Sequence, residues 1–292
     1  MRTFAEEANV LFIANKEYGT VRQSSPKGIG YLKDFYTVDT IDEKDSAEVE
    51  KNLSTIESTC LPLINKLKIG DDLSDSEWAD IAIYMAVQYG RTPYARARMD
   101  EVATIITTNE LKQKLADAIN NPDKYNELVE AVSTNNPSIH MPSRDELVEW
   151  VLKPGPLAKI SIDNGTYVQS FFRIAWEIAD GLLNTRWIVL HAPRGSSFIT
   201  SDNPMALSIN RELSVYETLA ILLPGVVRHF PLDSRTCLMM VGERTAREIQ
   251  HNIISKNEVR KINKLIYSQA LKYVISGNKT LLDSLTTRPT SR

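Results

Sequence analysis

Cysteine is scarce in this chain, which contains two cysteines, Cys60 and Cys237, in 292 residues. Neither belongs to a C-x-x-C pair, so the sequence supports neither a disulfide framework nor a cysteine-based zinc site. This scarcity favours a reducing, intracellular setting. The histidines are also few and stand apart from one another: His140, His191, His229 and His251. Because none of them has the spacing of a zinc-binding motif, the sequence predicts no zinc centre.

Long apolar runs are missing as well. The longest strongly apolar stretch, residues 219–227, is interrupted by Pro224 and Gly225, and it falls well short of the ~20 residues that a membrane-spanning helix needs. The first residues are charged and contain no apolar segment of the kind found in secretory signals. We therefore expect a soluble, cytoplasmic protein with no membrane partner.

Neither sign of charge dominates, since the net charge is −3 and the isoelectric point lies near 5.9. This balance argues against a broad basic surface for nucleic acid, although it leaves a local basic groove open. The chain also lacks a phosphate-binding P-loop and the G-x-S-x-G motif of serine hydrolases. Gly28 and Gly30 look like the start of a dinucleotide-binding motif, but Lys33 occupies the position of its third glycine, which favours a simple loop.

The hydrophobic pattern predicts an α+β fold, because helices and strands are segregated along the chain. The expected parts are a hairpin over residues 10–24, a helical region over about 46–183, a sheet region over about 186–242 and a closing helix over about 244–276. Ser74 and Glu77 form a capping box ahead of one helix, and Gly90 is expected to cap its end. We expect one domain of 292 residues. In it the hairpin and a mainly antiparallel C-terminal sheet pack against the helical region and the long closing helix.

Four polar residues lie where an apolar residue or a plain turn would be ordinary. Glu57 adjoins the apolar side of a predicted helix, where an unpaired charge is costly. Arg91 follows the next helix and can bind a carboxylate or a phosphate, so Glu57 and Arg91 are a natural pair. Asp202 and Asn203 end a predicted strand, and Pro204 forces Asn203 towards an extended conformation. A purely structural ion pair and an ordinary Asx turn explain the same residues and stay open as alternatives.

Five segments follow one another along the chain: VEKNLSTIE (residues 49–57), QYGRTP (88–93), FITSDNP (198–204), HFPLD (229–233) and INKLIY (262–267). Together they resemble the landmarks of domain-of-unknown-function family 4238. The resemblance spans nearly the whole chain, and it implies a single microbial intracellular domain. It implies no reaction, because the family has no known function.

Members of this family usually begin with a His-Tyr-Val-Pro-like segment, a few residues before the stretch that matches residues 1–5 of this chain. The sequence does not show that segment, so the resemblance implies a truncated or misassigned start. If that histidine completes a site with Glu57, Arg91 and Asp202, we expect this chain to be inactive. The edge of the first sheet is then also expected to lack a strand.

Two functional hypotheses from different classes follow. The first is a hydrolase that acts on a phosphodiester or a nucleotide, in which Glu57 and Asp202 bind a divalent cation or activate water. In this hypothesis Arg91 holds the anion and Asn203 orients the substrate. A host-defence role is suggested by analogy alone. The alternative is a non-catalytic binding or regulatory module, in which the same residues lock the helices onto the sheet. The substrate, the metal and the oligomeric state stay open, with a nucleotide or nucleic acid as the expected partner.

Overall fold

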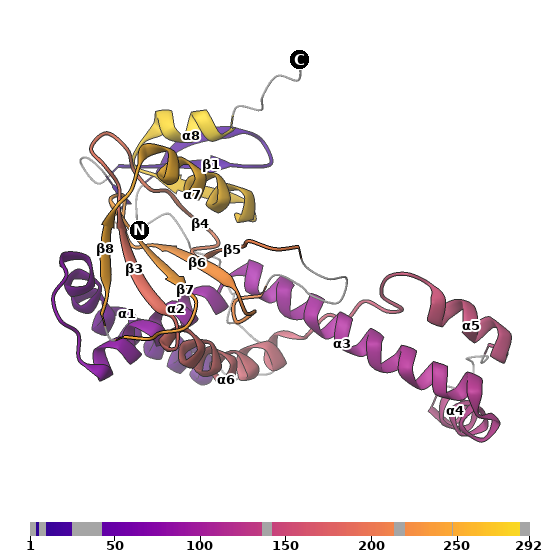
Figure 1. Cartoon of the computed structure of the whole chain (residues 1–292). Helices are drawn as coiled ribbons and strands as arrows, with labels where there is room; N and C mark the ends of the chain where they lie inside the picture. Colours follow the sequence, from indigo (N-terminus) through magenta and orange to yellow (C-terminus); the bar gives the residue numbers. More distant parts are fainter. Residues whose placement is uncertain are drawn as a thin grey trace, which may run out of the picture. The chain divides into compact units, whose positions relative to one another are not determined.

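A computed structural model of the chain describes residues 4–5, 10–24, 43–135, 142–212, 220–246 and 248–286 (Figure 1). The glycine loop at Gly28 and the histidine His140 lie outside these residues. By their contacts, the residues form two compact units: the first comprises Met1–Arg96 and Asn164–Arg292, and the second comprises Ala97–Asp163. The expectation of a single domain stays a prediction.

The first unit contains two β-sheets. The four-stranded sheet consists of β1 (Leu11–Asn15), β2 (Thr20–Ser24), β4 (Thr200–Ser201) and β9 (Tyr273–Ser276). Its order is β2-β1-β9-β4 and its strands are antiparallel, so the predicted N-terminal hairpin is confirmed. The five-stranded sheet consists of β3 (Arg186–His191), β5 (Ala206–Ile209), β6 (Val226–Pro231), β7 (Thr236–Val241) and β8 (Gln250–Ile253). Its order is β5-β6-β7-β3-β8, and every pair is antiparallel except β3 with β8.

Helices cover both faces of the five-stranded sheet (Figure 1). One face packs against α1 (Glu43–Ile69), α2 (Asp75–Gly90) and α6 (Asn164–Leu183). The other packs against α7 (Lys256–Gln269), and α8 (Lys279–Thr286) contacts the four-stranded sheet. The remaining helices are α3 (Pro93–Asn120), which begins in the first unit, and α4 (Pro122–Asn135) and α5 (Arg144–Leu152) in the second. The arrangement confirms the α+β class, and none of the described helices is long and apolar enough to cross a membrane.

The alternation of side chains along β3 explains how one strand serves two cores. Trp187 and Val189 point towards α1, α2 and α6, while Ile188 and Leu190 point towards α7, where Ile266 is also buried. All these side chains are buried. A strand buried on both faces forms an almost continuous apolar run, which is why the sequence indicates β3 clearly.

Local hydrogen bonds define the helix ends beside the sites. The hydroxyl of Ser74 accepts the Glu77 N–H at 3.3 Å, and the Glu77 carboxylate accepts the Ser74 N–H at 2.8 Å. The predicted capping box is therefore confirmed. Gly90, in contrast, is the last residue of α2 and no left-handed cap, because the C-cap is Arg91 with φ −77°. A side chain at Gly90 would collide with the ring of Phe171, so close packing explains this glycine.

The predicted closing helix over about 244–276 is wrong. That range forms β8, α7 and β9 instead. Ser255 accepts the Glu258 N–H at 3.2 Å in a capping box that starts α7 at Lys256. On either side of α7, the chain pairs with strands that are distant in the sequence: β8 with β3, and β9 with β1 and β4. This pairing overrides the local helical pattern.

Candidate functional site

The predicted pair of Glu57 and Arg91 is confirmed. Arg91 Nη1 lies 2.5 Å from Glu57 Oε1. Gln88 closes a triangle, since its Nε2 donates to Glu57 Oε1 at 3.1 Å and its Oε1 accepts from Arg91 Nη2 at 2.5 Å. Both terminal nitrogens of the Arg91 guanidinium are thus bound within the protein. We name these three residues the α1–α2 cluster, because they join α1 to the end of α2.

Tyr84 places the α1–α2 cluster beside the core. Burial raises the pKa of Tyr84 to about 12, with the charge of Arg91 acting against this shift and those of Glu57 and Cys60 adding to it. Its hydroxyl therefore stays protonated at neutral pH. Its ring meets the ring of Phe230 in β6 edge-on, with the centroids 6.2 Å apart. The cluster thus lies where the helices α1 and α2 pack against the sheet. This position is suited to stabilising the packing of α1 against α2.

Asp202 lies at the end of β4 and binds backbone. Its carboxylate accepts N–H groups from Leu271, Lys272 and Tyr273 at 2.8, 2.6 and 2.8 Å. It thereby satisfies the donors of the turn between α7 and β9. Among the residues that the structure describes, no hydrogen bond or ion pair joins Asp202 to Glu57 or to the rest of the α1–α2 cluster.

Asn203 is buried, with 1% of its surface exposed. Its Nδ2 donates to the carbonyl of Gln269 at 3.3 Å, and its backbone N–H donates to Ser201 Oγ at 3.1 Å. Its Oδ1 is buried without a hydrogen-bond partner. The structure therefore brings Glu57 together with Arg91, and ties Asp202 and Asn203 to the segment around the end of α7. In the described part of the chain, no hydrogen bond or ion pair joins these two pairs.

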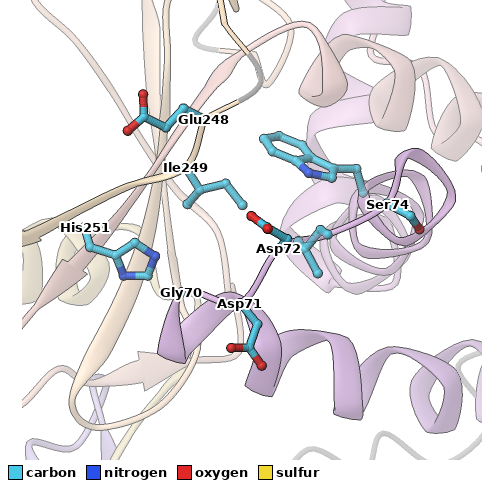
Figure 2. Close-up of a pocket in the computed structure, with 9 residues that line it drawn as sticks. Gly70, Asp71, Asp72, Ser74, Glu248, Ile249 and His251 are labelled. Carbon is cyan, nitrogen blue, oxygen red and sulfur yellow. The ribbon is translucent and has the colours of Figure 1, made fainter.

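A cavity of about 570 Å³ lies between the α1–α2 connection and the segment that contains β8 (Figure 2). We name it the acidic cavity, because the acidic residues Asp71, Asp72 and Glu248 are among those that line it. His251 and Trp78 also line the cavity. Figure 2 shows that His251 and Glu248 come from one segment, and that the two aspartates come from the facing connection.

Two histidines meet at the edge of the acidic cavity. His191 Nε2 and His251 Nδ1 are 3.0 Å apart, and the rings stack with their centroids 5.3 Å apart. The parallel pairing of β3 and β8 sets Val189 opposite His251, so both imidazoles lie on the sheet face that packs against α1. Because Nδ1 of His251 is bound to His191, its Nε2 is the nitrogen that remains for a ligand.

Asp233 supplies a negative charge close to this histidine pair. Its Oδ2 forms an ion pair with Lys68, and its Oδ1 accepts the backbone N–H groups of Arg235 and Thr236, both at 2.7 Å. Burial acts to raise the pKa of Asp233, but hydrogen bonds from Lys68, Thr236 and Arg235 outweigh it and the pKa is lowered. The carboxylate is therefore ionised at neutral pH.

His191 is held in its neutral form. Burial lowers the pKa of His191 and the neighbouring His251 lowers it further, whereas the charge of Asp233 acts in the opposite direction. A neutral imidazole can donate one hydrogen bond and accept another, so it can pass a proton. A hydrogen bond thus links His191 to His251, which lines the cavity, whereas Asp233 acts on His191 through its charge alone. A pair of linked imidazoles at a cavity can serve general acid–base catalysis.

Gly70 permits the close approach of α1 to His251. Its φ of +85° is strained for any other residue, and a Cβ there would lie 3.4 Å from His251 Nε2. Within the described ranges, no three His, Cys, Asp or Glu side chains are grouped so that they could hold a metal ion.

Sequence reasoning missed the histidine pair for one reason. His191 and His251 are 60 residues apart, and they meet only because β8 pairs with β3, in a region predicted to be helical. A signal was present, since Ser255 and Glu258 form the S-x-x-E pattern of a helix start. That pattern places residues 244–254 outside the helix and leaves them available for a strand.

A family model described as "Protein of unknown function (DUF4238)" matches residues 1–280. The match includes the α1–α2 cluster, Asp202 and the histidine pair. Comparison with curated proteins and with solved structures gave no match.

Proposed function

The chain belongs to the DUF4238 family, whose function is unknown, and from its candidate site we propose that it is a hydrolase. The observation that carries the proposal is the hydrogen bond between His191 and His251 at the wall of the acidic cavity. His251 acts as the general base and takes a proton from a water molecule, whose oxygen attacks the acyl carbon of the substrate. The bond to the leaving alcohol or amine then breaks, and the imidazolium of His251 returns the proton to that leaving group. His191 orients the ring of His251, and the charge of Asp233 stabilises the imidazolium that forms.

The charges of the acidic cavity restrict its substrate. Three acidic residues contribute to its lining, and their negative charges repel an anionic ligand. A phosphodiester or a nucleotide, the substrate class expected from the sequence, is therefore disfavoured here. A neutral or cationic ester or amide fits the charge of this cavity better.

Glu57 and Asp202 do not line the acidic cavity. Glu57 is bound to Arg91 and Gln88, and Asp202 is bound to three backbone N–H groups. We therefore propose that these carboxylates hold the fold together. Arg91 and Asn203 have the same kind of role, because their polar groups contact neighbouring elements.

A non-catalytic binding module is the second candidate. One observation favours it: all four polar residues predicted from the sequence bind other parts of the fold. In that case the acidic cavity binds a cationic ligand without transforming it. A host-defence role stays a prediction from analogy.

The test compares the wild-type protein with the His251→Gln and His191→Gln variants. The substrates are neutral and cationic p-nitrophenyl esters, an anilide and a p-nitrophenyl phosphodiester. We expect hydrolysis of an uncharged or cationic substrate, lowered about 10²–10⁴-fold in His251→Gln, because general base catalysis contributes that much. Glu57→Gln, outside the cavity, is the control and keeps its activity, while circular dichroism verifies the fold of each variant.

Two results would count against the hydrolase. Equal rates in the wild type and in folded His251→Gln would remove His251 as the base. No hydrolysis of any substrate, together with saturable binding of a cationic ester, would favour the binding module.

A further inference from the structure

A second cavity, of about 520 Å³, lies between the connection from β3 to β4, the first turns of α7, and α8. We name it the basic cavity, because Arg235, Lys256 and Arg260 line it. No carboxylate from the described part of the chain belongs to its lining. Three positive charges in one hollow are notable in a chain whose net charge is −3, and they favour an anionic ligand.

The wall of the basic cavity is held in place by its own hydrogen bonds. The Arg235 guanidinium donates to the carbonyls of Ser196 and Ala192, both at 2.6 Å. Asn263 of α7, which is 1% exposed, donates to the carbonyl of Ser197 at 2.8 Å. The connection from β3 to β4 is therefore held in position before any ligand arrives, which lowers the entropic cost of binding.

Lys256 and Arg260 are the two cations whose placement the fold itself does not explain. Lys256 is the first residue of α7, where a positive charge opposes the helix dipole. Arg260 follows four residues later, so two like charges face one another on the same side of the helix. Neither forms an ion pair or a side-chain hydrogen bond with a described residue. An anion between them would relieve both unfavourable interactions.

We propose that the basic cavity binds the phosphate groups of a small phosphorylated molecule, such as a nucleoside diphosphate. Lys256 and Arg260 bind the phosphate oxygens, and the hydroxyl of Thr280 donates a further hydrogen bond. Leu281 and Leu285 of α8 offer apolar surface for the remainder of the ligand. The volume lies in the range of about 300–1,000 Å³ that is usual for small-molecule sites. This inference concerns a different cavity from the proposed hydrolase site and does not depend on it.

The same observations favour a small molecule over a nucleic acid strand. Proteins that hold a strand neutralise many phosphates along its length, and their affinity depends steeply on salt for that reason. Here three cations converge on one cavity, and of these Lys256 and Arg260 form no ion pair or side-chain hydrogen bond with a described residue. One or two phosphate groups are enough to accept hydrogen bonds from both Lys256 and Arg260.

Isothermal titration calorimetry tests the proposal with pyrophosphate, ADP and an oligonucleotide without terminal phosphates. The test variant carries Lys256→Gln and Arg260→Gln. The matched control carries Lys261→Gln and Lys264→Gln, which remove two charges from exposed positions of the same helix. We expect saturable binding of pyrophosphate and ADP to the wild type. Binding should weaken about tenfold or more in the test variant, which loses two charge-assisted interactions, and about twofold or less in the control.

A second measurement keeps the result independent of folding. Because the two charges oppose α7, the test variant should melt no lower than the wild type in the absence of ligand. Pyrophosphate should then raise the melting temperature of the wild type and of the control, but not that of the test variant. Absence of saturable binding to both pyrophosphate and ADP, equal losses in test variant and control, or tightest binding of the oligonucleotide would each overturn the proposal.

Discussion

The Gly90→Ala variant tests the packing of the helices that support the acidic cavity. A Cβ on Gly90 would lie 2.7 Å from Phe171 Cδ2 and still closer to Cε2, whereas carbon atoms in contact are about 3.5–4 Å apart. Phe171 is 4% exposed, and its ring contacts those of Tyr167 and Phe172. Tyr167 also donates a hydrogen bond to the Gly90 carbonyl. The ring cannot move without disturbing these neighbours.

Two opposing effects set the magnitude. Overpacking a buried site costs about 1–3 kcal/mol, and the short distance places this case near the upper end. Alanine stabilises a helix by about 1 kcal/mol relative to glycine. The expected net loss is therefore about 2 kcal/mol in the free energy of unfolding. In a unit of this size, that corresponds to a fall of about 4–8 °C in melting temperature.

Gly181 in α6 provides a matched control. A Cβ there would meet Leu222 Cδ2, but Leu222 is 42% exposed and can turn into solvent. Gly181→Ala should therefore keep the helix gain of about 1 kcal/mol and melt about 2–4 °C higher than the wild type. Thermal and urea denaturation, followed by circular dichroism, measure both variants. If Gly90→Ala proved as stable as the wild type, or if both variants shifted in the same direction, the packing argument would be wrong.

Three further predictions concern polar groups. Burial lowers the pKa of His229 to about 4. Since the pKa of an unfolded histidine is about 6.5, the unfolded state binds the proton first, and stability should fall by about 3 kcal/mol between pH 6.5 and 4. Urea titrations should show this slope in the wild type and not in His229→Gln. Asp202→Asn should lower the free energy of unfolding by about 1–3 kcal/mol, because one amide oxygen replaces a carboxylate bound by three N–H groups; unchanged urea unfolding would contradict that role. A double-mutant cycle of Glu57→Gln and Arg91→Met should give a coupling energy of about 0.5–1 kcal/mol, since both side chains are partly exposed. A value of zero would mean that the pair does not brace α1 against α2.

Features set by neighbouring residues could be predicted from the sequence. The capping box of Ser74 and Glu77 marks the start of α2, because both hydrogen bonds form within four residues. The hairpin of β1 and β2 needs only a short turn at Asn15. The pair of Glu57 and Arg91 could also be predicted. Glu57 adjoins the apolar side of one helix and Arg91 lies at the end of the next, and both helices are evident from the sequence pattern.

Features that depend on distant partners could not be predicted in this way. β8 and β9 exist because they pair with β3 and with β1, and their own residues show an ordinary amphipathic pattern. Asp202 illustrates the same limit for a site residue. The sequence indicated an acid at a strand end, but its partners are backbone groups about 70 residues away, which no side-chain motif encodes.

The segment that was predicted to be helical contributes residues to the lining of both cavities. β8 presents His251 to the acidic cavity, and the Ile254 N–H donates to the carbonyl of His191 at 3.1 Å, so the chain crosses the end of β3 there. The first turns of α7 then present Lys256 and Arg260 to the basic cavity. One short segment therefore lines both the acidic cavity and the basic cavity. Because charge decides which ligand enters, the histidine pair suits a neutral or cationic substrate, and a phosphate belongs with the cations of α7.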